Sequence, residues 1–190
     1  MSGTPTAEDI SPRDLTILKV RVANPTASTR ELSAILEAEY DVSLSHNRIN
    51  EILRELAEAE VFRETIIPNE GLFNHYLFRI AFFHPNFAEY WEDCYWSLVD
   101  DPHVMMFFNA DSDYHWHVLA QFRRHEQMER WVHGFFKEHG KLISGFHNTS
   151  LHGVHKFHTD AAIFDDILAE TEEGRKYLES HAQAASEADD

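Results

Sequence analysis

The chain has 190 residues, of which 43% are hydrophobic, enough to bury the core of one compact domain or of two small ones. Acidic residues outnumber basic ones 33 to 16, and the net charge of −17 disfavours nonspecific binding to nucleic acid or to anionic membranes in dilute salt. The single cysteine, Cys94, excludes an internal disulfide framework and a cysteine-cluster zinc site.

An acid excess with few lysines indicates a salt-rich cytoplasm, although an ordinary acidic protein has a similar composition. In molar salt the Debye length falls to about 3 Å, so repulsion between the chain and DNA is largely screened there. The longest apolar runs are too short to cross a bilayer, and residues 1–9 lack the features of a signal peptide. We therefore expect a cytoplasmic protein that does not contact membranes.

Residues 12–60 are predicted to form three short helices. Proline at position 12 is typical of a first helical residue, and Ser28 has capping-box spacing to Glu31 at the start of the second helix. The third helix begins at Ser45. Its apolar residues follow at spacings of three and four, which predicts one buried face: Ile49, Ile52, Leu53 and Leu56.

The third helix is followed by a β-prone segment, residues 61–67, and this order is typical of a winged helix-turn-helix. Asparagine and arginine on its polar face can make bidentate contacts to base edges, and arginine can also bind phosphate. The alternative is a solvated helix face in a small helical domain. The residues predicted to contact double-stranded DNA are Ser45, His46, Asn47, Arg48, Asn50 and Arg54.

The apolar pattern changes after residue 75 and predicts the order βαββαβ. Two crossover helices on one antiparallel sheet make a ferredoxin-like unit, with both helices on the same face. The other face is rich in aromatic residues and histidines, so we expect it to be buried against a second subunit. The predicted strands span residues 75–83, 104–109, 114–122 and 145–158, and the helices span 86–99 and 126–139.

These patterns divide the chain into four parts. The division predicts a short helix over 161–177 and a solvated, acidic end from residue 182. The parts are a winged helix-turn-helix DNA-binding domain over 10–67, a linker over 68–74, a dimerisation or sensing domain over 75–160, and an acidic C-terminal helix and tail over 161–190.

Several short motifs resemble those of the Lrp/AsnC family of transcription regulators, whose second domain is called RAM. The resemblance spans about residues 12–158 and implies the fold class α+β, a winged helix-turn-helix followed by a ferredoxin-like, RAM-like βαββαβ domain. It also implies a homodimer or higher oligomer in which two winged helix-turn-helix domains enter adjacent major grooves of DNA. The motifs are Asp-Leu-Thr-Ile-Leu at 14–18, Arg-Glu-Leu-Ser at 30–33, the helix at 45–56, Asp-Pro-His-Val at 101–104 and Ser-Asp-Tyr-His at 112–115.

The 112–115 motif departs from the family hairpin, which has Gly-Asp-Tyr-Asp. Ser112 replaces a glycine that permits positive φ, and His115 replaces the second acid. If a small-molecule effector exists, the resemblance implies that it binds at this hairpin. The residues predicted to bind an effector are Asp111, Asp113, Tyr114, His115 and His117.

Twelve of the 14 histidines lie between positions 75 and 158, which raises the alternative of a metal or haem site. His115 and His117 are expected to share a strand face, whereas the histidines at 152, 155 and 158 would alternate. No His-Glu-x-x-His pattern is present. We therefore predict no bound metal and no cofactor.

A second resemblance keeps a cofactor hypothesis open, because siroheme decarboxylases share the same two-domain architecture. An aromatic cleft near His115, His117, Arg123 and Arg124 would then hold a tetrapyrrole, with the arginines pairing its carboxylates. A third hypothesis is a protein-docking module, since glutamates also lie on the third helix. The sequence favours the DNA-binding regulator, which is not an enzyme.

Overall fold

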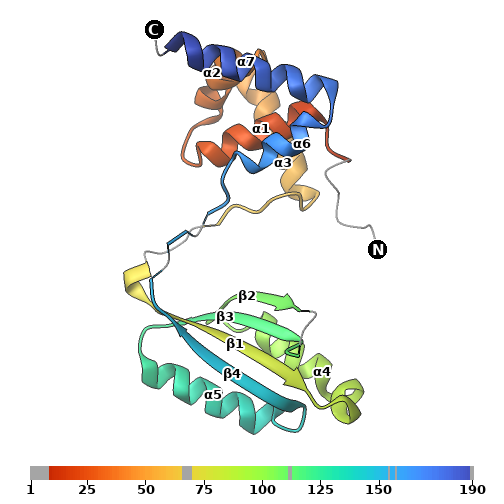
Figure 1. Ribbon diagram of the computed structural model, residues 1–190, viewed down its shortest axis with the longest axis vertical. Coiled ribbons are helices and arrows are strands. Elements are labelled where there is room, and N and C mark those ends of the chain that lie inside the picture. Colours follow the sequence, from red (N-terminus) through yellow and green to blue (C-terminus); the bar gives the residue numbers. More distant parts are fainter. Residues whose placement is uncertain (1–8, 66–69, 111–112, 154, 157, 189–190) are drawn as a thin grey trace. The chain divides into compact units, whose positions relative to one another are not determined.

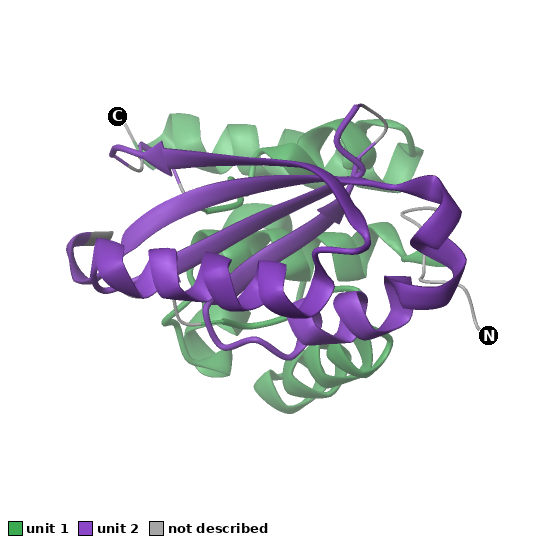
Figure 2. Cartoon of the chain, turned by 90° about the horizontal axis from the view of Figure 1, so that it is seen from below, with its two compact units in different colours: residues 1–65, 157–190 green, residues 66–156 purple. Residues whose placement is uncertain are grey.

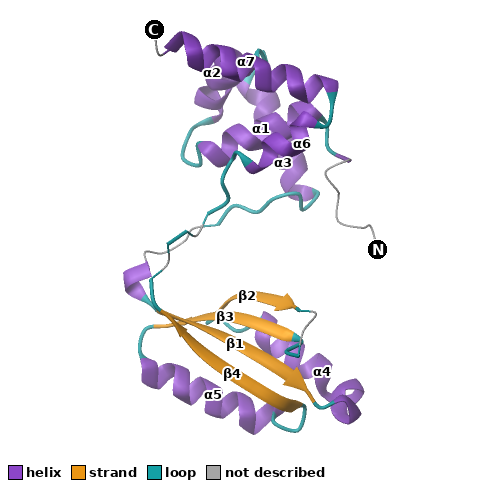
Figure 3. Ribbon diagram, in the orientation of Figure 1, coloured by secondary structure: helices purple, strands orange, loops and turns teal. Residues whose placement is uncertain are grey.

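The computed structural model describes residues 9–65, 70–110, 113–153, 155–156 and 158–188. The chain forms two compact units, residues 1–65 with 157–190 and residues 66–156, which are coloured separately in Figure 2. The described part of the first unit contains helices and no strand, whereas the second combines helices with a sheet (Figure 3). The predicted α+β class is confirmed.

The first unit begins with the three predicted helices, each started by a serine cap. Ser11 Oγ accepts the Asp14 amide at 3.1 Å, and Ser28 and Glu31 form the predicted capping box. These caps satisfy amides that a helix start leaves without intrahelical partners. The helices are α1 (Pro12–Ala23), α2 (Thr29–Tyr40) and α3 (His46–Glu58), and their apolar faces meet in one core.

The predicted wing is wrong over the residues that can be described. Residues 61–65 form no strand, and residues 66 and 67 lie outside the described part of the chain. Val61 and Phe62 instead pack as partly buried side chains against the helical core. No neighbouring strand in 9–65 offers hydrogen-bond partners, and an unpaired strand is unstable in water.

The C-terminal segment corrects the predicted tail. Two helices, α6 (Ile163–Ala169) and α7 (Glu172–Ala188), pack against α1 and α2 within the first unit (Figure 1). Residues 182–188 are therefore helical. The sequence pattern missed this because the apolar positions of α7 are few, and part of the contact is polar and aromatic.

Two contacts attach these helices. Lys19, buried on α1, forms an ion pair with Asp165 on α6. His181 on α7 stacks on Tyr40 of α2, with ring centroids 4.6 Å apart and planes 4° apart. Burial raises the pKa of Tyr40 to about 12.

The second unit has the predicted element order. Its four strands form one antiparallel sheet in the order β2-β3-β1-β4, which is the ferredoxin-like arrangement. A 3-10 turn, η2 (Glu70–Leu72), precedes the sheet. The elements are β1 (Asn74–Phe82), α4 (His84–Val99), β2 (Val104–Asn109), β3 (Trp116–Phe122), α5 (His125–His139) and β4 (Ile143–Leu151).

Burial alternates along the central strands and separates the two faces of the sheet. The helix-facing side of β1 and β3 is buried under α4 and α5, which lie on the same face (Figure 1). The open face, defined here as the opposite side of the sheet, is covered by no helix of this unit in the described residues. β4 ends at Leu151, so the predicted strand through His158 is too long.

Candidate nucleic-acid interface

Helix α3 has two faces of different chemistry. Its four predicted apolar residues are all buried in the core that α3 shares with α1 and α2. The remaining positions reach the surface and are polar apart from Ala57, and Asn47, Asn50 and Arg54 are exposed. The helix therefore presents a continuous polar surface, which is the arrangement that a recognition helix needs to enter a DNA groove.

The connection between α2 and α3 holds the polar face of α3 in a defined orientation. Asp41 adopts a left-handed conformation with φ 55°, which ends α2. The Ser33 hydroxyl then donates to the Leu44 carbonyl at 2.6 Å, so the loop is tied back to α2. This is the compact turn of a helix-turn-helix.

Two of the predicted contact residues are not simply exposed. The Ser45 hydroxyl accepts the Arg48 amide at 3.3 Å, so its acceptor capacity serves the helix cap. His46 is only half-exposed. The polar groups that α3 presents for contact with DNA are therefore those of Asn47, Asn50 and the two arginines.

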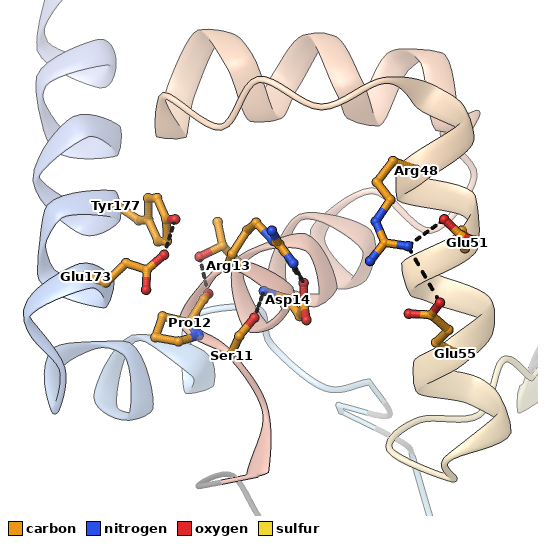
Figure 4. Close-up of polar contacts among 10 residues, drawn as sticks. Ser11, Pro12, Arg13, Asp14, Arg48, Glu51, Glu55, Glu173 and Tyr177 are labelled. Atoms are coloured by element: carbon orange, nitrogen blue, oxygen red, sulfur yellow. Dashed lines mark hydrogen bonds and ion pairs between the residues drawn. The ribbon is translucent and has the colours of Figure 1, made fainter.

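Both arginines of α3 are held by glutamates of the same helix, and Figure 4 shows the contacts of Arg48. Arg48 Nη1 lies 2.5 Å from Glu51 Oε2 and 3.6 Å from Glu55 Oε1, and the Glu51 contact raises the Arg48 pKa. Arg54 Nε lies 3.7 Å from Glu58 Oε1. Exposed pairs of this kind are weak, so a DNA phosphate can replace the glutamate as partner.

The C-terminal helices leave this surface open. Helix α7 packs on α1 and α2, and α7 and α3 lie on opposite sides of α1 (Figure 4). On α7, the Tyr177 hydroxyl donates to Glu173 at 2.6 Å, and burial raises the Tyr177 pKa to about 12. The acidic C-terminal addition therefore lies away from the polar face of α3.

Arg30 is a further candidate contact that the sequence analysis did not assign to DNA. It is exposed in the first turn of α2, and it forms no ion pair with the described residues. The start of a helix favours phosphate, because its free amides and dipole point toward an anion. The sequence carried one signal for this contact, which is the position of the arginine two residues after the Ser28 cap.

The predicted effector residues do not form one cluster. Asp111 lies outside the described residues, and Asp113 is exposed. His117 lies on the open face, whereas the His115 Nδ1 accepts the Phe82 amide at 3.4 Å and its ring packs on Phe82. The prediction that His115 and His117 share a face is therefore wrong, because His115 precedes β3 and does not follow its alternation.

The residues of the tetrapyrrole hypothesis are also separated. His115 precedes β3, whereas Arg123 and Arg124 follow it, and a strand of seven residues is roughly 23 Å long. Two pockets in the described residues, one between α1 and α6 and one between α5 and β4, do not join the two ends. Among the described residues, no three His, Cys, Asp or Glu side chains converge on a point that could hold a metal ion.

Comparison with solved structures finds the same fold in several transcription regulators. AsnC from E. coli has a TM-score of 0.61 with 12% identity, and the match covers 80% of this chain and 98% of that one. The regulator NMB0573 from Neisseria meningitidis, solved with L-Met, has a TM-score of 0.64 with 18% identity over 80% and 95%. This chain has the fold of those regulators.

A third structure, PH0061, has a TM-score of 0.66 with 19% identity and covers 79% of this chain and 97% of its own. About a fifth of this chain thus lies outside each of the three matches. No family profile and no curated protein sequence matches the chain. None of the described helices is long and apolar enough to cross a membrane.

Proposed function

We propose that this protein is a sequence-specific DNA-binding transcription regulator of the Lrp/AsnC type. The observation that carries the proposal is the exposed polar face of α3, where Asn47 and Asn50 project beside two arginines from a helix-turn-helix. Asparagine reads adenine and arginine reads guanine or binds phosphate in the major groove. The fold shared with solved transcription regulators supports this function over a catalytic one.

The charge of the chain sets the conditions for this binding. The net charge of −17 opposes DNA at long range, and the glutamates of α3 occupy its arginines. Molar salt screens the long-range repulsion over about 3 Å but leaves close contacts to bases intact. We therefore place the protein in a salt-rich cytoplasm, where base contacts rather than net charge select the DNA site.

The open face supports assembly into a dimer. Met106, Phe108 and Leu151 keep 40%, 50% and 38% of their surface exposed there, and no helix of the described unit covers them. Exposed apolar side chains grouped on one face are typical of a subunit interface. Two copies that pair these sheets would carry two α3 helices, as a pseudo-palindromic site requires.

Genome-wide capture of DNA bound to the full chain, in cells grown at high salt, tests the proposal. The expected result is a set of discrete promoter peaks that share a sequence motif. The same capture with the Asn50→Ala chain should lose the peaks while protein abundance is unchanged. Uniform recovery of the genome by both chains would contradict the proposal.

A further inference from the structure

Exposed apolar side chains gather on the outer side of α4. Trp91 and Trp96 keep 38% and 52% of their surface exposed, and Val99 keeps 44%. Within the described residues neither indole N–H has an acceptor, whereas the Trp131 indole donates to Asp101 at 2.7 Å. Tryptophan buries a large apolar area and is enriched where proteins bind one another. The outer side of α4 is therefore a candidate interaction surface.

The two exposed indoles belong to one continuous surface, named here the aromatic band, which consists of Trp91, Tyr95 and Trp96. The Tyr95 ring centroid lies 6.1 Å from that of Trp91 and 5.2 Å from that of Trp96. Two further rings support the band. Phe87 stacks on Trp91 with centroids 6.1 Å apart, and Phe107 of β2 lies 5.4 Å from Tyr95. Because these rings hold one another, little conformational entropy is lost when a partner covers them.

Carboxylates border the aromatic band, and α4 contains no lysine or arginine to neutralise them. Glu92 lies one turn before Trp96, and Asp100 lies one turn after it. Glu89 and Asp93 lie on the same exposed side of the helix. All four acids are exposed, and none forms an ion pair with another described residue. The surface therefore combines aromatic rings with unpaired negative charge.

α4 already holds one cation over an aromatic ring. Lys141 Nζ lies 5.8 Å from the ring centroid of Tyr90. In the part of the chain that the structure describes, no cation lies over Trp91, Tyr95 or Trp96. A guanidinium can stack on such rings and pair with a neighbouring carboxylate at the same time. The aromatic band therefore has the chemistry that binds arginine.

Other occupants fit this surface less well. Its carboxylates repel DNA phosphates and anionic lipid headgroups. In a two-fold contact between copies the same acidic surface would face itself, which brings like charges together. Neither of the two pockets described above includes a residue of α4, and small molecules favour concave sites. A basic, partly apolar segment of another protein matches both the rings and the charges.

We propose that the aromatic band binds a basic amphipathic segment of another protein. Apolar side chains of this segment cover Trp91 and Trp96, and its arginines pair with Glu92 and Asp100. The contact lies in the second unit and uses no residue of α3, so it goes beyond the proposed DNA binding. Molar salt weakens the ion pairs, whereas burial of the indoles maintains the contact there.

Selection from a random peptide library displayed on phage tests this inference, with the full chain as bait in molar salt. The peptides should be as long as α4, which has 16 residues. Enriched peptides should carry a net positive charge, with arginines next to aromatic or aliphatic residues. Enrichment of peptides without a net positive charge, or of none, would overturn the proposal.

Variants locate the site, with fluorescence anisotropy of a labelled, enriched peptide as the readout. Trp96→Gln should weaken peptide binding about tenfold or more, because a large ring within a contact carries much of the binding energy. Phe136→Gln is the matched control, since Phe136 is 40% exposed but lies on α5. If Trp96→Gln binds the peptide as tightly as the wild type, the aromatic band is not the site.

A double variant tests the role of the carboxylates. Glu92→Gln with Asp100→Asn should weaken peptide binding about tenfold in dilute salt and less in molar salt, because salt screens the ion pairs. Glu179→Gln with Glu187→Gln makes the same change in net charge on α7 and should bind as the wild type does. Equal losses in the two double variants would show attraction to the net charge alone and contradict the proposal.

Light scattering separates a protein partner from a second copy of this chain. Trp96→Gln should keep the mass of the wild type, because the band is proposed to bind another protein. A fall in mass would place a second copy on the aromatic band and overturn the proposal. These measurements contain no DNA, so a negative result leaves the proposed function standing.

Discussion

Arg48 and Glu51 lie one turn apart on α3, and the Arg48 guanidinium is bound to the Glu51 carboxylate 2.5 Å away on the face proposed to contact DNA. The pair has two opposite consequences for DNA binding. It keeps the arginine ordered near the helix start, and it places a negative charge where phosphates would approach. Exposed ion pairs are weak, so a DNA phosphate can replace the glutamate as the partner of Arg48.

Removing the Glu51 charge should tighten DNA binding. Glu51→Gln removes the closer of the two carboxylates that hold Arg48, leaving Glu55, and we expect affinity for the selected site to rise about three- to tenfold. Fluorescence anisotropy with labelled duplex measures this change. Glu179→Gln, on the exposed side of α7, makes the same change in net charge and should have little effect. Equal gains in the two variants would point to net charge rather than to α3.

Removing the arginine should have the opposite effect. Arg48→Ala should weaken binding at molar salt by about tenfold and lower the dependence of log K on log salt concentration by about one if Arg48 binds phosphate. The oligomeric state, checked by light scattering, should not change. If both affinity and salt slope match the wild type, Arg48 does not contact DNA.

The C-terminal helices should contribute to the stability of the helical unit. A Cβ on Gly174 would lie 2.1 Å from the Leu168 carbonyl oxygen, so α6 and α7 meet backbone to backbone there. Gly174→Ala should lower the free energy of unfolding by about 1–3 kcal/mol. In α5, Gly134 has no atom within 4 Å of such a Cβ, and Gly134→Ala should be neutral or stabilising by up to about 1 kcal/mol. Urea denaturation compares the two variants, and an equally stable Gly174→Ala would show that these helices are not packed closely.

Stability should fall as the pH falls below the ordinary histidine pKa. Burial lowers the pKa of His139, which lies against Phe135 at the end of α5. The unfolded chain then binds this proton more readily, so stability is complete above the unfolded pKa of about 6.5 and declines below it. His139→Gln should flatten this decline in urea denaturation at pH 7.5, 6.5 and 5.5. If the free energy of unfolding depends on pH in the same way in His139→Gln as in the wild type, groups other than His139 cause the decline.

The dimer should depend on the open face. Phe108→Glu places a charge on a ring that is 50% exposed on β2, and we expect the mass in light scattering to fall to that of the 22.1-kDa chain. Trp96→Glu is the control, since Trp96 is 52% exposed but lies on α4. If Trp96→Glu gives a monomer and Phe108→Glu does not, the dimer interface lies on the helical side of the unit instead.

Local patterns predicted most of the elements because they depend on neighbouring residues. Capping at Ser28 and the apolar spacing of α3 are visible in the sequence and reappear in the structure. The change of apolar pattern after residue 75 similarly predicted the order of strands and helices in the second unit.

The failures concern contacts between distant segments. The attachment of α7 rests on single pairs such as Tyr40 with His181, which are 141 positions apart and leave no periodic signal. The hydrogen bond between Arg79 and His147 was missed for the same reason, since the two residues become neighbours only through strand pairing. The ion pairs of Arg48 followed from helical spacing and were foreseeable in principle.

Selection of bound duplexes from a random DNA pool at molar salt, with the wild-type chain and with an Asn47→Ala, Asn50→Ala chain, tests the central claim most directly. The account predicts one enriched two-fold motif for the wild type, and loss of base preference for the double variant while its dimer and its urea midpoint are retained. Enrichment of the same motif by both chains, or of none by the wild type, would contradict the assignment of α3 as the helix that reads DNA.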